Sequence, residues 1–156
     1  MSSMITLGSL KRITAPKLAE QLLARAEAGA AAGDSTIAIV DVRDDDHIGG
    51  HINGSLHFPS QSLDAMMPTL LRKLEDKETV VFHCALSQQR GPSAALRYMR
   101  ERADLVEKAS KQGKEEKPQT VYVLDRGFVG WQEVYGTDKR LTEGYRTELW
   151  KDGYWG

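Results

Sequence analysis

The 156-residue chain contains a single cysteine, Cys84. It therefore cannot form an intramolecular disulfide, and a zinc site made of cysteine thiolates would lack ligands. A lone cysteine is typical of proteins in a reducing compartment, so we expect the protein in the cytoplasm and also, given its small size, in the nucleus.

Long apolar runs and a strong net charge are missing as well. No stretch approaches the ~20 apolar residues of a membrane span, and Met1–Gly8 lacks the basic start and apolar run of a signal peptide. The formal net charge is −1, which argues against bulk electrostatic binding to nucleic acid or acidic membranes. Any attraction for an anion must therefore be local.

What the chain does contain is an alternation of apolar, β-branched runs with helical patterns. The segments Thr36–Val42, Thr79–His83 and Thr120–Leu124 have the composition of strands buried on both faces of a parallel sheet. Strands separated by helices predict right-handed crossovers, and hence an α/β fold with a mostly parallel central sheet flanked by helices on both faces. We expect residues 1–137 to form one domain, and the aromatic tail 138–156 to pack on it.

Shorter elements complete the predicted order. Leu10–Ile13 and Leu56–Phe58 are predicted to be short strands, and Phe128–Tyr135 a short helix. Thr14 is predicted to cap the first helix, which has Pro16 in its first turn. The tail that follows residue 137 contains Tyr145, Trp150, Tyr154 and Trp155.

Two longer helices are expected between the buried strands. The first begins at Ser60 or Ser62 and contains Pro68, which is predicted to bend or split it. Its expected inward side chains are Leu63, Met66, Leu70 and Leu74. The second is predicted from about Pro92 to Ser110. Its expected inward side chains are Ala95, Tyr98, Met99 and Leu105.

The carboxyl ends of parallel strands meet at one edge of the sheet, where binding sites lie. Three loops leave the predicted strands at this edge: Asp41–Gly54, Cys84–Arg90 and Asp125–Gly130. We therefore expect the functional site to combine residues from these loops.

The loop from Cys84 to Arg90 carries the predicted chemistry. Gly91-Pro92 follows it, so the loop lies just ahead of a helix N-terminus, where free N–H groups bind anions and favour a thiolate. The planar fork of Arg90 suits two oxygens of phosphate or arsenate. We predict that Cys84 is the nucleophile and Arg90 the oxyanion ligand. Backbone amides are predicted to bind the remaining oxygens, from Ala85, Leu86, Ser87, Gln88, Gln89 and Arg90.

A purely structural interpretation of the same loop stays open at this point. Free cysteine is often a small buried apolar residue, and Arg90 would then be a cation at the start of a helix. The residues around the loop decide between the two interpretations.

The sequence His83-Cys84-(five residues)-Arg90-Gly91-Pro92 resembles the signature of rhodanese-fold phosphatases related to the cell-cycle dual-specificity phosphatases. It is at least as similar to small single-domain relatives in fungi and plants, some of which are regarded as arsenate reductases. Two further segments resemble the same fold, Ile39–Ser55 with its Asp-x-Arg and Gly-His-Ile-x-Gly-Ser patterns, and Tyr122–Trp131 with its Gly-Phe-x-x-Trp turn.

The resemblance implies roles for residues outside the active loop. Asp41, Arg43 and His51 match positions that brace the loops in the family. Asp46 matches an acid that pairs with the loop arginine. Asp44 and Asp45, together with Asp46, are candidates for a proton donor or for loop support.

The active loop departs from the cell-cycle enzymes in one respect that matters. Gln89 stands where those enzymes carry a glutamate, and Ala85 also replaces an acid. A positioned acid contributes typically ~10²–10⁴-fold to the departure of a leaving group. Its loss weakens the case for protein dephosphorylation but matters less for arsenate, whose leaving group is hydroxide or water.

Four functions follow, in order of preference. The first is a Cys-dependent phosphatase of the phosphotyrosine or dual-specificity class, and the second is an arsenate reductase with glutathione as co-substrate and glutaredoxin as partner. The third is a phosphate-binding module with little turnover. A sulfurtransferase is least favoured, because rhodaneses typically have one residue fewer in this loop. We expect an oxyanion or a phosphoprotein as substrate, and no metal or bound cofactor.

Overall fold

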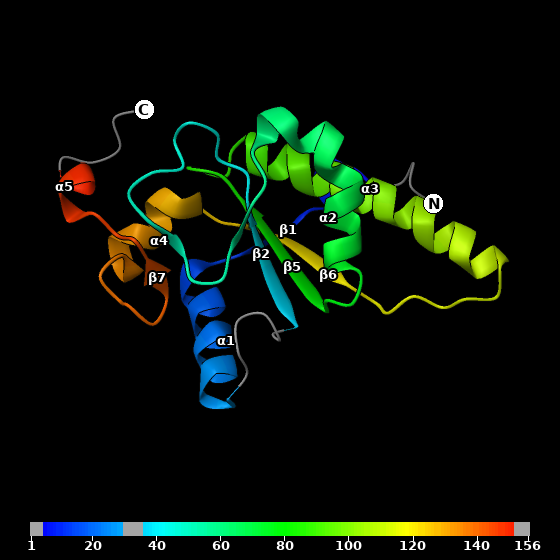
Figure 1. Ribbon diagram of the computed structural model, residues 1–156, viewed down its shortest axis with the longest axis horizontal. Coiled ribbons are helices and arrows are strands. Elements are labelled where there is room, and N and C mark those ends of the chain that lie inside the picture. The colour runs from blue at the N-terminus through cyan, green and yellow to red at the C-terminus, as the bar shows by residue number, and fades with distance from the viewer. Residues whose placement is uncertain (1–4, 30–35, 152–156) are drawn as a thin grey trace.

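The computed structural model describes residues 5–29 and 36–151, and a five-stranded parallel sheet lies at its centre (Figure 1). The strand order is β1-β6-β5-β2-β4. Their bounds are β1 Lys11–Ile13, β2 Ile37–Asp41, β4 Leu56–His57, β5 Thr79–His83 and β6 Thr120–Leu124. All five predicted strands are present, and the predicted mostly parallel sheet is confirmed.

Helices cover both faces of this sheet, as expected. α2 (Leu63–Leu74) and α3 (Arg90–Lys111) pack on one face, while α1 (Ala15–Glu27) and α4 (Gly127–Tyr135) pack on the other (Figure 1). Two short 3₁₀ turns, η2 at Leu7–Ser9 and η4 at Ser60–Ser62, precede β1 and α2. Each face of the sheet therefore has its own apolar core. The carboxyl edge of the sheet, where the strands end, is left for a site.

The first helix begins where the sequence predicts. The Thr14 hydroxyl accepts a hydrogen bond from the backbone N–H of Lys17 (3.3 Å), which satisfies one of the free donors of the first turn of α1. Proline lies within this turn, where its missing N–H costs nothing. The helix then packs through Leu18 and Ala19 against β2 and α4 residues of the same core.

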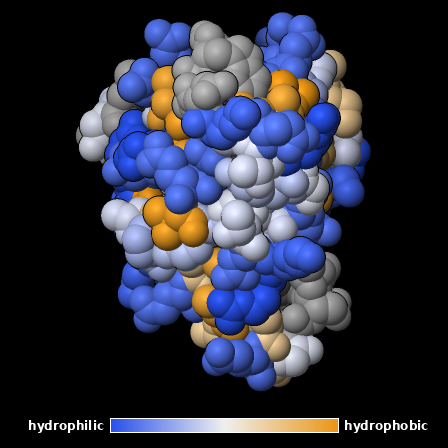
Figure 2. Space-filling model, turned by 90° about the vertical axis from the view of Figure 1, so that its left-hand side faces the viewer, coloured by the Kyte–Doolittle hydropathy of each residue, from blue (hydrophilic) through white to orange (hydrophobic). Residues whose placement is uncertain are grey.

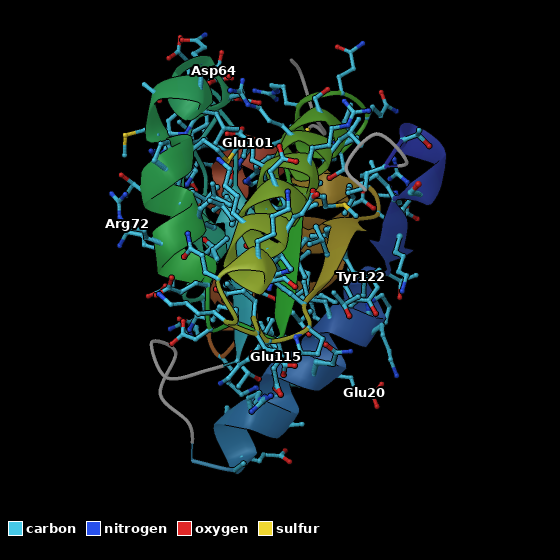
Figure 3. The ribbon with its side chains drawn as sticks, turned by 90° about the vertical axis from the view of Figure 1, so that its right-hand side faces the viewer. Glu20, Asp64, Arg72, Glu101, Glu115 and Tyr122 are labelled. Atoms are coloured by element: carbon cyan, nitrogen blue, oxygen red, sulfur yellow. The ribbon has the colours of Figure 1, made fainter. Side chains whose placement is uncertain are left out.

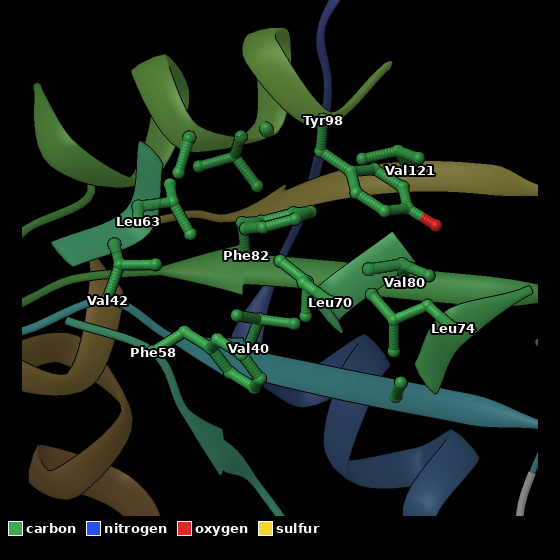
Figure 4. Packing of buried hydrophobic residues seen from close by; sticks show 14 of the residues in the cluster. Val40, Val42, Phe58, Leu63, Leu70, Leu74, Val80, Phe82, Tyr98 and Val121 are labelled. Carbon is green, nitrogen blue, oxygen red and sulfur yellow. The ribbon is translucent and has the colours of Figure 1, made fainter. Parts of the chain in front are cut away.

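The core between the sheet and helices α2 and α3 is shown in Figure 4. Phe82 of β5 and Tyr98 of α3 meet with ring centroids 5.4 Å apart. The Tyr98 hydroxyl donates to Gln119 (2.7 Å), so its buried polar end is satisfied. Burial raises the pKa of Tyr98 to about 12. This core holds β5, and thus the base of the active loop, rigidly in place.

Three details of the helices differ from the sequence prediction. Met67 is fully buried in α2, whereas Met66, the predicted inward residue, is 38% exposed. Pro68 lies inside a single continuous helix, so of the two predicted outcomes the split was wrong, and the bend stays a prediction. Leu105 was also predicted to face inward but is 49% exposed, because the far half of α3 runs beyond the sheet (Figure 1).

The C-terminal segment returns to the domain through a small second sheet. β3 (His51–Ile52) pairs antiparallel with β7 (Thr142–Glu143), and α5 (Thr147–Trp150) follows. The Trp131 indole donates to the Thr142 hydroxyl (2.9 Å). Tyr154 and Trp155 of the predicted tail lie outside the described residues, and a domain boundary at residue 137 stays a prediction.

The surface on the side of α4, β7 and α5 is largely hydrophilic, with scattered apolar residues (Figure 2). Across residues 5–29 and 36–151, every helix is too short or too polar to cross a membrane.

Candidate active site

Cys84 lies directly after the central strand β5, at the carboxyl edge of the sheet. The residues from Ala85 to Gln89 form a loop that ends at the first residue of α3, Arg90. The backbone N–H of Gly91 donates to Cys84 Sγ (3.4 Å), and the thiol is only 3% exposed. The sulfur therefore faces the amino end of α3, where donors and the helix dipole stabilise negative charge.

The amino end of α4 supports the loop from the neighbouring strand. Phe128 N donates to the Cys84 carbonyl (3.0 Å), and Val129 N donates to the Ala85 carbonyl (2.9 Å). A side chain at position 127 would lie 2.5 Å from the Ala85 carbonyl oxygen, so Gly127 is required for this approach. Because both carbonyl oxygens are engaged by α4, they do not compete for the space where the loop amides would meet an anion.

Ser87 is the strained centre of the loop. Its φ is 56°, an uncommon value for a residue with a side chain, and its carbonyl accepts from Arg12 Nη2 (3.2 Å). The residue is fully buried, and its hydroxyl has no hydrogen-bond partner in the part of the chain that the structure describes. An unmade hydrogen bond of a buried hydroxyl costs about 1–3 kcal/mol. The donor capacity of the Ser87 hydroxyl is thus unused among the described residues.

The remaining loop side chains point outward or are small. Leu86, Gln88 and Gln89 are exposed, whereas Ala85 is buried. These residues therefore contribute backbone rather than side chains to the interior of the loop.

Arg90 is held by two carboxylates of the loop that follows β2. Its Nη1 and Nη2 donate to the two oxygens of Asp46 (2.8 and 2.6 Å), and Nη1 also donates to Asp44 (3.3 Å). These bonds raise the pKa of Arg90 and, against partial burial, lower the pKa of Asp46. The Asp46 carboxylate occupies the end of the guanidinium, where Nη1 and Nη2 each donate one N–H. The side edge, formed by Nε–H and the other N–H of Nη2, has no bond within residues 5–29 and 36–151. That side retains two parallel donors for an oxyanion.

Asp44 is fixed by further donors. It accepts from the Ser60 hydroxyl (2.5 Å) and from Gln61 N (3.0 Å). Burial opposes ionisation, but the Ser60, Gln61 and Arg90 hydrogen bonds together lower the pKa of Asp44. Asp45, the third predicted acid, is exposed. Both carboxyls that reach Arg90 are thus ionised and act as acceptors at neutral pH.

A buried ion pair lies next to the loop of residues 44–50, the acidic loop, which carries Asp44 and Asp46. Arg43 donates to Asp41 through Nη2 (2.7 Å) and Nε (3.1 Å), and both side chains are almost fully buried. Arg43 also donates to the Gly50 carbonyl (2.9 Å) and lies 4.3 Å above the Phe128 ring. Despite burial, His83 and Arg43 hold the pKa of Asp41 well below its usual range. The pair thereby fastens the acidic loop to β2 and α4.

Histidine side chains lie near the Asp41–Arg43 pair. Among the described residues, none of them forms a hydrogen bond with Cys84 Sγ. His83 is fully buried; its Nδ1–H donates to the Cys84 carbonyl (2.9 Å), and burial lowers its pKa. His47 stacks on His57 with ring centroids 3.8 Å apart. His51, predicted to brace the loops, lies in β3 with Nε2 3.4 Å from Glu143, and its ring stacks on that of His47 with centroids 5.8 Å apart. It therefore contacts both the C-terminal segment and the loop that follows β2.

A groove of about 340 Å³ opens beside Arg90, between the starts of α2 and α3. Its polar and charged lining consists of Ser60, Asp64, Gln89, Arg90, Ser93 and Arg97. Asp64 and Glu101, which both pair with Arg97, are seen on the two helices in Figure 3. A larger hollow of about 470 Å³ between α2 and α3 includes Pro68 and Leu105 but no residue of the Cys84–Arg90 loop. The groove, and not the larger hollow, therefore gives access to Arg90.

Comparison with known proteins identifies the fold. A model of the rhodanese-like domain matches residues 18–134. The chain belongs to the rhodanese-like family. It is similar to the dual specificity phosphatase Cdc25 of Arabidopsis thaliana, with 43% identity over 97 residues, which cover 62% of either chain. It is also similar to arsenate reductase 2.1 of Oryza sativa subsp. japonica, with 40% identity over 126 residues, or 80% of this chain and 71% of the rice protein.

A solved rhodanese-like structure supports the same assignment. The crystal structure of Saccharomyces cerevisiae Ygr203w, described as a homologue of single-domain rhodanese and of the Cdc25 phosphatase catalytic domain, superposes with a TM-score of 0.71 at 32% identity. The alignment covers 94% of this chain and 95% of the yeast chain. The resemblance inferred from the three motifs is therefore confirmed at the level of the family and its fold.

The rhodanese-like site also contains contacts that sequence reasoning missed. Ser60 was considered only as a helix cap, yet it holds Asp44. Arg12 was given no role, yet it holds the strained Ser87. Both contacts join residues far apart in the chain, and no local pattern marks them.

For the phosphatase activity proposed below, we expect Asp44→Asn to slow all phosphate substrates by the same factor, about three- to tenfold, the range for loss of one hydrogen bond. Because the pKa values of Asp44 and Asp46 are lowered, both stay ionised down to about pH 4, and their pairing with Arg90 weakens only below that. The measurement is kcat/KM for an aryl phosphate and for an alkyl phosphate. Asp45→Asn serves as the matched control. A loss confined to the alkyl phosphate would instead identify Asp44 as a proton donor.

Proposed function

We propose that this rhodanese-like protein is a Cys-dependent phosphatase of the phosphotyrosine or dual-specificity class. Cys84 Sγ attacks the phosphorus of a phosphate monoester in line with the leaving oxygen, and water then hydrolyses the cysteinyl-phosphate. The observation that carries this proposal is the position of the thiol, enclosed by a loop that ends on Arg90 and hydrogen-bonded by Gly91 N at the start of α3.

The roles proposed for the loop follow from the charge that develops during transfer. The Nε–Nη2 side of Arg90 and the loop amides from Ala85 to Arg90 would bind the equatorial oxygens. Ser87 would donate its unpaired hydroxyl to the sulfur or to an oxygen. Asp44 and Asp46 act as positioning residues in this scheme, because their bonds to Arg90 set the direction of the fork.

A second candidate function is arsenate reduction by the same loop. Its support is the state of the nearby acids: Asp44 and Asp46 have lowered pKa values and are committed to Arg90, and Gln89 is no acid. Arsenate loses hydroxide or water when Cys84 attacks, so it needs a proton donor less than an ester does. The two electrons would then come from external thiols, glutathione and a glutaredoxin, since the chain has one cysteine.

Two further functions are less well supported. A phosphate-binding module with little turnover would not need the thiol that the loop encloses. A sulfurtransferase is disfavoured by the seven-residue length of the Cys84–Arg90 loop. We further propose a reducing compartment, the cytoplasm or nucleus, because the mechanism needs a free thiolate.

The deciding experiment compares two activities of the purified protein, with Cys84→Ser as control. Arsenate reduction is measured with glutathione and glutaredoxin, and hydrolysis is measured with an aryl phosphate. Dominant hydrolysis supports the phosphatase, and dominant reduction supports the reductase. Absence of both in the wild type would contradict both enzymatic proposals and favour the binding module.

A further inference from the structure

The C-terminal segment makes direct hydrogen bonds to the loop that holds Arg90. Trp150 Nε1 donates to the Gly49 carbonyl (3.0 Å), and Arg146 N donates to the same oxygen (3.3 Å). The Trp150 ring also packs on Phe128, with centroids 5.7 Å apart. Arg146 and Trp150 lie beyond the end of the rhodanese-like match at residue 134.

We propose that Trp150 is a positioning residue for the oxyanion site, which it serves through the loop of residues 44–50. The loop holds Arg90 at its beginning, through Asp44 and Asp46, and meets Trp150 at its end, through Gly49. This inference rests on the proposed function of Arg90 as the oxyanion ligand. It adds a role for a part of the chain outside the matched family domain.

The backbone at Gly49 is shaped for this contact. Its φ is 77°, and a side chain at this position would lie 2.5 Å from Trp150 Nε1. Gly50 follows with a φ of 121°, and a side chain there would lie 3.1 Å from the Tyr145 backbone. Only glycine combines these conformations with so close an approach. The loop and the C-terminal segment are therefore fitted to each other.

Rigid contacts connect Gly49 with Arg90. Arg43, itself held by the buried Asp41, donates to the Gly50 carbonyl (2.9 Å) and approaches the Ile48 and Asp46 carbonyls (both 3.5 Å). Within the loop, Asp44 N donates to Asp46 Oδ1 (2.9 Å). Fixing the loop at Gly49 thus restricts the Asp46 carboxylate, and the carboxylate in turn sets the direction of the Arg90 fork.

The test is Trp150→Phe, which keeps an aromatic ring on Phe128 but removes the Nε1–H donor. We expect its affinity for phosphate or tungstate, measured by calorimetry, to fall about three- to tenfold, as for loss of one hydrogen bond. The rate of Cys84 alkylation by iodoacetamide, a neutral reagent, should stay within about twofold of wild type. Tyr145→Phe is the matched control, since its hydroxyl bonds to Gln132 of α4 and not to the loop; its anion affinity should be unchanged.

A double-mutant cycle separates positioning from general destabilisation. If Trp150 acts through Asp46, Trp150→Phe should have no further effect on anion affinity in an Asp46→Ala background. Equal effects in both backgrounds, a parallel change in alkylation rate, or an unchanged affinity would each overturn the proposal. Gly49→Ala, which displaces the indole, should reproduce the loss. Anion binding is read without turnover, so failure of the phosphatase proposal and failure of this one are distinguishable.

Discussion

Cys84→Ser is expected to lower kcat for an aryl phosphate by about 10⁴-fold or more, while phosphate affinity stays within a few-fold of wild type. The serine hydroxyl is not ionised at neutral pH, and so it cannot replace the thiolate as a nucleophile. It is nearly isosteric, however, and can accept the Gly91 hydrogen bond that Sγ accepts. The two quantities are measured by steady-state hydrolysis and by calorimetry with phosphate.

An acid-quench experiment gives an independent check on Cys84. The wild-type protein mixed with excess ³²P-labelled substrate should retain label on the chain, and the serine variant should not. Superimposable thermal unfolding curves are the control for folding. Turnover of the serine variant within tenfold of wild type would remove Cys84 from the mechanism.

Arg90→Lys is expected to lower kcat/KM by about 10²–10³-fold, the loss typical when an oxyanion donor is removed. A lysine ammonium is a point charge and cannot present two parallel donors to one anion while Asp46 holds its other side. The measurement is kcat/KM for the aryl phosphate together with the inhibition constant of phosphate.

Arg97→Lys is the matched control for this substitution. Arg97 lies on the same helix and lines the same groove, but its ion-pair partners among the described residues are Asp64 and Glu101, neither of which belongs to the acidic loop. We expect it to retain nearly the full rate with small substrates. A near-normal rate for Arg90→Lys would show that the arginine does not bind the reacting anion.

The sheet and its active edge could be predicted from sequence because their signals are local. Thr79–His83 and Thr120–Leu124 are short β-branched apolar runs, which are typical of strands in the middle of a parallel sheet, and the structure has β5 and β6 at the same bounds. Once these strands are parallel, their carboxyl ends must share an edge. This geometry alone brings the Asp44–Asp46 loop beside Arg90. The family motifs add the prediction that Asp46 pairs with Arg90.

The errors arose where two patterns fit the sequence equally well. Both Met66 and Met67 are spaced to share a helical face with Leu63, at three and four residues, and only the position of the sheet selects Met67. Leu105 continues the apolar face of α3 in sequence, but the sheet ends before the helix does. The Trp150–Gly49 contact joins distant segments, and no periodicity reports on such a pair.

The sheet order has a consequence for how the protein is made. β5, the strand that ends at the nucleophile, is central, and each of its neighbours comes from a different part of the chain. A ribosome releases the amino-terminal residues first, so β1 must wait for β6, because Lys11 pairs with Tyr122. The β2–β5 pair can form earlier, but the α4 amides that hold the Cys84 and Ala85 carbonyls emerge only after β6. A nascent chain therefore carries an incomplete loop around its thiol until nearly the whole domain has been synthesised.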